Sequence, residues 1–212
     1  MRVALINGSP KTKNSASGAI LKDLESYFPE YVTVQTYDVH TAQLSDDVIE
    51  ELFHADAWVF SFPLYVDGIP GHLLSCLVQM ETVCAQNCRV AVYGIVNCGF
   101  YEGIQNETAL KILQNWCEKT GLTWSGGIGI GGGGAMGMLP EMEREKGPKA
   151  PINLALRVLA ERIFLCKTQE NCYVSLAMPR LFYKAGAQMG WRQMIRANGG
   201  RIRDLGKKMI GS

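Results

Sequence analysis

The sequence predicts an α/β protein built on a doubly wound parallel sheet. Two observations lead to this prediction: short apolar, strand-like runs recur along the chain, and amphipathic helical segments lie between them. Several of the runs are apolar almost throughout, which is typical of strands buried on both faces of a parallel sheet. Five such strands alternating with helices favour a sheet covered by helices on both faces.

The expected strands are rich in β-branched or aromatic residues and cover residues 2–7, 32–37, 57–62, 89–96 and 122–130. The expected helices carry apolar residues at three- and four-residue spacing, so each set falls on one helical face. These sets are Ile20, Leu21, Leu24 and Phe28, then Leu73, Leu74, Leu77 and Val78, and then Ala109, Leu113, Trp116 and Cys117.

The C-terminal part departs from this alternation. Residues 126–137 are dense in glycine, residues 141–149 are charged and predict an exposed loop, and residues 152–166 predict a helix. Beyond Thr168 we expect one or two helices packed outside the sheet. The predicted organisation is one domain over residues 1–167, followed by a basic helical extension over residues 168–212.

Charge is distributed unevenly along the chain, whose formal net charge is +1. From Arg180 onward there are eight basic residues and one acid, Asp204, so the first 179 residues carry thirteen basic and nineteen acidic groups, a net of −6. The sequence therefore combines a neutral-to-acidic body with a basic tail. We expect no nucleic-acid partner.

The sequence predicts neither a membrane span nor export. No run reaches eighteen apolar residues, and Met1 leads almost directly into a strand-like run without a basic region or a cleavage site. We therefore expect a cytoplasmic protein. Seven cysteines are an odd number and predict reduced thiols in that compartment. Only Cys84 and Cys88 lie near each other and the three histidines are scattered, so we expect no metal site.

The loop after the first strand, residues 8–17, is the first candidate site. In an open parallel sheet, ligands bind outside the carboxyl ends of the strands, where the winding direction reverses. This loop offers hydroxyls, a small-residue backbone, a helix amino terminus and the charge of Lys11 or Lys13, which together suit a phosphate group. It matches neither the nucleoside-triphosphate loop nor the dinucleotide turn. The alternative is that Ser15 or Ser17 merely caps the helix.

The loops after the third and fourth strands favour a flat ligand. Residues 63–70 are apolar and aromatic where a surface loop is normally polar, and such loops at a crevice usually face an apolar ligand. Alternatively, Leu64 and Tyr65 fold back onto the core. Residues 97–103 combine glycine backbone donors, the Asn97 amide and two aromatic rings, which suit the edge and the face of a planar ring.

Together, the three loops resemble those of the NAD(P)H-dependent FMN reductases and related quinone reductases, which are flavodoxin-like flavoproteins. The resemblance covers roughly residues 1–166 and rests on GSPKTKNSAS, PLYVDGIPGHL and NCGFYEG, in that order. It implies a flavodoxin-like sheet in the order 2-1-3-4-5, bound FMN, NADH or NADPH as electron donor, and a homodimer. The residues that it places around FMN are Ser9, Lys11, Asn14, Ser15, Ala16, Ser17, Pro63, Leu64, Tyr65, Val66, Asn97, Cys98, Gly99, Phe100 and Tyr101.

The resemblance also implies a role for each loop. The first would bind the FMN phosphate, the second would line the ribityl chain and ring, and the third would contact the isoalloxazine. Many relatives have an Asn-Thr pair where this chain has Ala16 and Ser17, so backbone amides would have to replace one side-chain donor. No strict catalytic residue is expected, because FMN supplies the hydride chemistry. Tyr65, Phe100 and Tyr101 are expected to shape the stacking site, and a quinone, flavin or other small molecule would accept the electrons.

Two other classes of function stay open from the sequence. One is a one-electron carrier like flavodoxin, although such carriers have a strongly acidic body. The other is a flavin-binding regulatory or interaction protein whose basic, aromatic tail meets anionic lipid, an acidic partner or dinucleotide phosphates. The simplest alternative for the tail is a helix packed on the domain with solvated charges. Cys98 lies in the expected flavin loop, but a redox role would require an accessible, electropositive setting.

Overall fold

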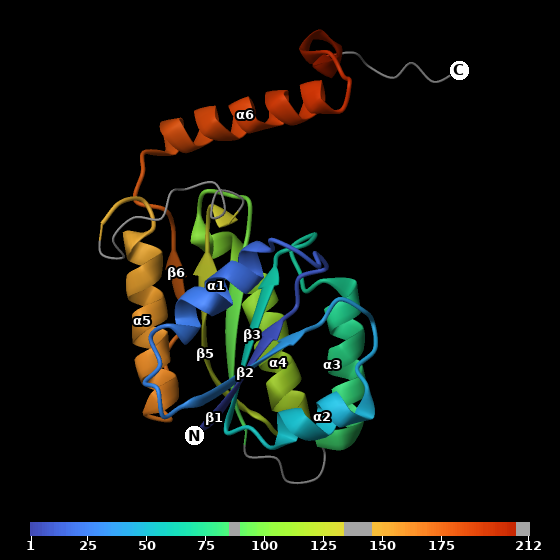
Figure 1. Cartoon of the computed structure of the whole chain (residues 1–212), viewed down its shortest axis with the longest axis vertical. Coiled ribbons are helices and arrows are strands. Elements are labelled where there is room, and N and C mark those ends of the chain that lie inside the picture. The colour runs from blue at the N-terminus through green and yellow to red at the C-terminus, as the bar shows by residue number, and fades with distance from the viewer. Residues whose placement is uncertain (85–89, 134–145, 207–212) are drawn as a thin grey trace. The chain divides into compact units, whose positions relative to one another are not determined.

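The computed structural model of the chain describes residues 1–84, 90–133 and 146–206 (Figure 1). The elements follow in the order β1 (Arg2–Asn7), α1 (Ala16–Glu25), β2 (Thr33–Asp38), α2 (Asp46–Phe53), β3 (Ala57–Pro63), α3 (Gly71–Cys84), β4 (Ala91–Asn97), the 3₁₀ helix η1 (Gly103–Asn106), α4 (Glu107–Thr120), β5 (Thr123–Ile130), α5 (Ala150–Phe164), β6 (Cys172–Val174), α6 (Arg180–Ala197) and the 3₁₀ helix η3 (Ile202–Gly206). The chain divides into two compact units, Met1–Ala177 and Met178–Ser212.

Six parallel strands form the sheet of the first unit, in the order β2-β1-β3-β4-β5-β6. The five predicted strands are present in the predicted order. The prediction of five strands is nevertheless wrong, because β6 adds a sixth beside β5. No pattern in the sequence indicates β6, which has only three residues, all half-buried. It lies in the stretch after Thr168, where we expected helices outside the sheet.

Helices cover both faces of the sheet, as expected. Figure 1 shows α1 and α5 on one face and α2, α3 and α4 on the other. On the second face, the rings of Trp58 and Phe60 from β3 and of Trp116 from α4 pack edge to face, with centroids 6.3 and 6.1 Å apart. All three side chains are buried, so this aromatic row forms the centre of the core beneath the loops described below.

The helical periodicity in the sequence identifies the buried faces of two helices and misreads a third. Helix α1 buries Ile20, Leu21 and Leu24, and α4 buries Ala109, Leu113, Trp116 and Cys117. In α3, Leu73 and Leu77 are buried, whereas Leu74 and Val78 are 44% and 56% exposed. A helix lying on a sheet buries only one stripe of side chains. The residue directly after a buried one is rotated around the helix axis, so its side chain lies outside that stripe.

The second unit contains α6 and η3. Helix α6 has 18 residues, and none of them is buried. No helix within the described residues is both long and apolar enough to span a bilayer. Residues 134–137 of the glycine-dense segment, residues 141–145 of the predicted charged loop, the Cys84 side chain and Cys88 lie outside the described part of the chain.

Candidate functional site

The loop after β1 is held by Asn7, the last residue of that strand. The Asn7 amide donates hydrogen bonds to Asp38 Oδ1 (2.7 Å) and Ser15 Oγ (3.4 Å), and its side-chain oxygen accepts one from the Ser9 N–H (3.2 Å). Asn7 is 5% exposed, so these bonds form away from water. The Nδ1 atom of His40 lies 2.8 Å from the Ser9 carbonyl oxygen. One buried amide thus fixes both ends of the predicted phosphate loop.

The amino terminus of α1 faces this loop. Ser15 is the N-cap residue, and its Oγ accepts a hydrogen bond from the Gly18 N–H at 3.0 Å. The N–H groups of Ala16 and Ser17 belong to the first helical turn, where no intrahelical carbonyl is in reach. With the positive end of the helix dipole, these N–H groups can bind an anion.

The five residues before the cap, 10–14, are all exposed, and Lys11, Lys13 and Asn14 are among them. The backbone of Lys11 is tied down, because its N–H donates to Ser9 Oγ at 3.3 Å. Asn14 has φ 52°, a left-handed conformation that asparagine tolerates better than most residues. This turn lets the chain reverse directly before Ser15 starts the helix.

Asn97, the last residue of β4, connects the three predicted loops. Its side-chain amide donates hydrogen bonds to Ser17 Oγ (2.8 Å) and to the Phe62 carbonyl oxygen (3.1 Å). Its own carbonyl oxygen accepts one from the Leu64 N–H at 2.8 Å. Asn97 and Ser17 are 4% and 1% exposed. The Ser17 hydroxyl therefore supports Asn97, and only the Ser17 N–H is placed to meet a ligand.

Pro63 is the last residue of β3, and the loop after it continues into a tight two-residue turn. Tyr65 and Gly68 exchange backbone hydrogen bonds of 3.2 and 3.0 Å, and Val66 and Asp67 between them have φ 49° and 56°. A β-branched residue rarely adopts this conformation. Leu64 packs against the core, whereas Tyr65 is 46% exposed and Val66 is fully exposed. The alternative that Leu64 and Tyr65 fold back onto the core thus holds for Leu64 and fails for Tyr65.

The loop after β4 presents an exposed ring. Phe100 is 56% exposed and Tyr101 is half-buried. A side chain at Gly99 would meet no neighbouring atom, so the space beside this residue is open. The Phe100 carbonyl oxygen accepts a hydrogen bond from the Gly132 N–H at 2.6 Å, and that of Cys98 accepts one from Gly133 at 2.7 Å. The described part of the glycine-dense segment therefore lies against this loop.

Cys98 is enclosed by protein. It is 4% exposed, and burial raises the pKa of its thiol, outweighing the lowering by hydrogen bonds to Phe100 and Asn106. The buried Asn106 amide lies 3.4 Å from Cys98 Sγ and donates to the carbonyl oxygens of Gly103 (2.9 Å) and Ile130 (3.1 Å). The accessible setting that a redox thiol requires is absent at Cys98.

Sequence reasoning missed several residues that build the site: Asn7, Asp38, His40, Ser61 and Asn106. The signal for Asn7 was present, because an asparagine ends a strand of otherwise apolar residues, as Asn97 does in β4. Ser61 is fully buried and donates from Oγ to the Ser17 carbonyl oxygen at 3.2 Å. Asn106 ends the 3₁₀ helix η1, where the sequence has no comparable pattern. Within residues 1–84, 90–133 and 146–206, no three histidine, cysteine or acidic side chains are grouped so as to hold a metal ion.

Comparisons with known proteins identify the architecture. No protein-family model and no curated protein sequence matches the chain. Solved structures do match: Smu.1420 from Streptococcus mutans UA159 (TM-score 0.56, 12% identity, 76% of this chain and 100% of that one) and the NAD(P)H:quinone oxidoreductase from Methanothermobacter marburgensis (0.53, 17%, 77% and 96%). The flavodoxin of Streptococcus pneumonia TIGR4 matches with a TM-score of 0.51 at 11% identity, over 78% of this chain and 99% of that one.

The chain has the flavodoxin-like fold. In this fold, the strand order reverses between β1 and β3, and the loops after these strands flank the point of reversal. The residues predicted from the sequence lie on those two loops and on the neighbouring loop after β4. Asn97 bonds to Ser17 beside the first loop and to Phe62 and Leu64 beside the second. The flavodoxin-like fold therefore brings together the amino terminus of a helix, an apolar turn and an exposed aromatic ring.

Proposed function

We propose that the chain is an FMN-binding oxidoreductase that accepts hydride from NADH or NADPH and passes electrons to a quinone, a flavin or another small acceptor. The observation that carries this proposal is the hydrogen bonding of Asn97, which joins the first turn of α1 to the loops after β3 and β4. In flavodoxin-like folds, FMN binds at the reversal point between β1 and β3.

The residues at the α1 terminus fit a phosphate group. The N–H groups of Ala16 and Ser17 supply donors, and the Ser15 hydroxyl accepts from the Gly18 N–H, so its own hydrogen is available to a ligand oxygen. Lys11 and Lys13 are exposed beside this terminus in the sequence. The backbone amides therefore compensate for the Asn-Thr pair that the chain lacks.

The other two loops fit a planar ring. Tyr65 and Val66 present apolar surface on a turn that its own hydrogen bonds make rigid, and Phe100 presents an aromatic face beside the open space at Gly99. Such exposed apolar groups at the carboxyl edge of a parallel sheet are typical of a ligand site. In this proposal Tyr65 and Phe100 orient the ring and a second substrate by stacking.

When bound, FMN supplies the hydride and electron chemistry. The chain's own residues would bind and orient it: the α1 amides would neutralise the phosphate, Asn97 fixes the spacing of the loops, and Phe100 would contact the ring. Cys98 takes no part, because its thiol is buried and remains protonated. The named activity of the Methanothermobacter marburgensis oxidoreductase, which has the same fold, agrees with the proposal.

The test is the visible spectrum of the purified chain after FMN addition and desalting, followed by anaerobic addition of NADH and, separately, NADPH. We expect retained flavin that bleaches rapidly with at least one donor. Retained flavin that neither donor bleaches would instead support the electron-carrier alternative. Loss of all flavin on desalting would contradict the site itself.

A further inference from the structure

Helix α6 exposes large apolar side chains along its whole length. Leu181, Phe182, Met189, Trp191 and Met194 are between 56% and 74% exposed. A helix of a folded domain normally buries an apolar stripe, yet α6 buries no residue. Exposed aromatic and aliphatic groups in such number mark a surface that binds something else.

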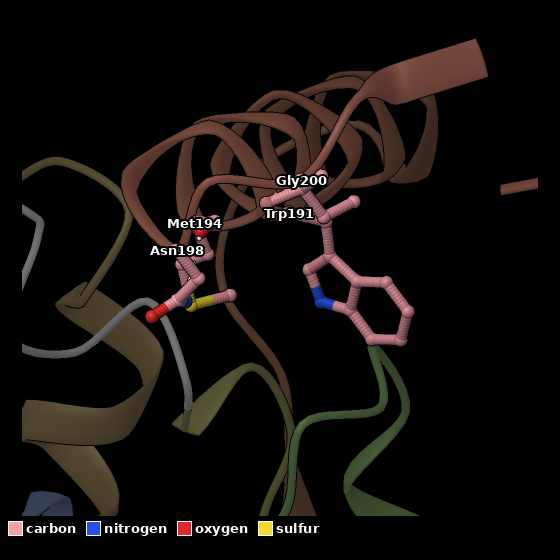
Figure 2. Close-up of a pocket in the computed structure, with 5 residues that line it drawn as sticks. Trp191, Met194, Asn198 and Gly200 are labelled. Carbon is pink, nitrogen blue, oxygen red and sulfur yellow. Dashed lines mark hydrogen bonds between the residues drawn. The ribbon is translucent and has the colours of Figure 1, made fainter. Parts of the chain in front are cut away.

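Among the described residues of its own unit, α6 contacts the segment that follows it, including η3. Trp191, Met194, Ile195, Asn198 and Gly200 border a hollow with a volume of about 330 Å³. Figure 2 shows the side chains of Trp191 and Met194 projecting from the same side of the helix. Both side chains border this hollow and stay more than half exposed to solvent.

The same segment is strongly basic. Residues 178–212 hold eight basic residues and one acid, Asp204, which gives a net charge of +7 against −6 for the remainder of the chain. The basic residues of this segment that are exposed in the described part are Arg180, Lys184, Arg192, Arg196, Arg201 and Arg203. Four to eight such residues on a helix with apolar groups are typical of segments that recognise anionic lipid.

Helix α6 also needs an external surface for its own stability. Gly186 and Gly190 lie in its interior, and a side chain at either position would meet open space, so no close packing explains them. Each glycine weakens a helix by about 1 kcal/mol relative to alanine. Most helical stability in proteins comes from tertiary packing of one helix face. Binding to an external surface would supply the packing that the second unit itself does not provide.

We propose that residues 178–206 bind the surface of a bilayer that contains anionic headgroups, with α6 lying in the interface. Trp191 and Met194, which project from the same side of α6, would enter the headgroup boundary, while the long Arg192 and Arg196 side chains reach the phosphates. A bilayer fits this segment because basic residues together with tryptophan, phenylalanine and leucine are typical of helices that lie in a membrane interface. This proposal does not depend on the proposed flavin chemistry.

The test uses the full chain and sedimented vesicles, either of phosphatidylcholine alone or with about one third phosphatidylglycerol, a fraction that gives a surface potential of the kind basic segments sense. We expect binding to the anionic vesicles and little to the neutral ones, with affinity falling as salt is raised. The Trp191 emission should shift to the blue on binding. This signal is specific, since Trp191 is 67% exposed while Trp58 and Trp116 are buried and Trp124 is half-buried.

Two variants separate the contributions. Arg192→Gln with Arg196→Gln should weaken binding by roughly twenty-five-fold, because each basic residue near an anionic surface contributes roughly fivefold. Trp191→Ser, measured by sedimentation, should reduce the affinity and leave the salt dependence in place. The matched control is Lys22→Gln with Tyr31→Ser, which alters an exposed basic and an exposed aromatic residue of the first unit and should bind like the unchanged chain.

Equal binding by the charge variant and the unchanged chain would overturn the proposal, and so would failure to bind anionic vesicles at low salt. Retention on immobilised poly-glutamate without vesicle binding would assign the segment to an acidic protein and equally overturn it. Circular dichroism on each variant verifies the fold. Because vesicle binding is measured without flavin or nicotinamide, its failure is distinguishable from failure of the proposed activity.

Discussion

The Asn97 amide and the Ser17 hydroxyl meet across 2.8 Å, and through them the end of β4 holds the first turn of α1. Both residues are buried, and they are 80 positions apart in the sequence. A buried polar contact of this kind stabilises only when both partners are present, because each alone would be left unsatisfied.

We therefore predict that Asn97→Ala lowers the free energy of unfolding by about 1–3 kcal/mol, since Ser17 Oγ and the Phe62 carbonyl lose their donor. Urea unfolding measures the change. Combined with Ser17→Ala in a double-mutant cycle, the two substitutions should show a coupling energy of about 0.5–3 kcal/mol. Additive effects would show that the two side chains act independently. FMN titration of Asn97→Ala should show weaker binding.

Ser15→Asp tests the phosphate site. Aspartate caps a helix about as well as serine, so the Gly18 N–H keeps an acceptor, and circular dichroism verifies that the variant folds. The added negative charge, however, lies where the phosphate is proposed to bind, and FMN affinity should fall by tenfold or more, roughly the effect of 1.4 kcal/mol. The matched control is Ser45→Asp, since Ser45 caps α2 in the same way. Equal FMN affinity in both variants would remove Ser15 from the site.

Val66→Asn tests the strain in the turn after β3. Asparagine accepts positive φ more readily than a β-branched residue, so the variant should be more stable by about 1 kcal/mol in urea unfolding. Val78→Asn is the control, because Val78 is also exposed but lies in a helix. An unchanged or lowered stability of Val66→Asn would mean that the valine side chain makes a stabilising contact.

Cys98 should react with iodoacetamide far more slowly than the exposed Cys166 in the native chain, because its thiol is buried and its pKa is raised. Mass spectrometry after timed labelling measures the two rates. The raised pKa also predicts how stability changes with pH. Above pH 9.0 the Cys98 thiol loses its proton in the unfolded chain before it does so in the native chain, so the contribution of Cys98 to stability falls as pH rises. Comparable labelling rates for Cys98 and Cys166 would contradict this assignment.

The sequence was sufficient for the elements whose signal is local. Strand β1 begins and ends at the predicted residues because every residue after Arg2 is buried, and α4 follows its periodicity because it lies on the sheet along one stripe. Strand β6 could not be predicted, because its three residues form a strand only through their pairing with Ile128, Gly129 and Ile130 of β5. Long-range pairing of that kind leaves no pattern in a short segment.

The candidate site was predictable as loops and only partly as side chains. The serine-rich stretch before α1 indicates an anion site through its chemistry alone. That Ser17 would face Asn97 instead of the crevice depends on the distance between α1 and β4, which no local pattern encodes. Asn7 was visible as a polar end to an apolar strand, whereas Asn106 gains its role only because Ile130 lies beside it.

The short strand β6 has a consequence for how copies of this chain behave when concentrated. Edge strands invite pairing between molecules, and that pairing leads to aggregation. With three residues, β6 covers the carboxyl-terminal part of β5 and offers few unpaired backbone groups of its own. At the opposite edge, β2 carries Thr33, Gln35 and Asp38, polar residues that discourage stacking of a second sheet. Both margins of the sheet thus oppose the growth of intermolecular β-structure.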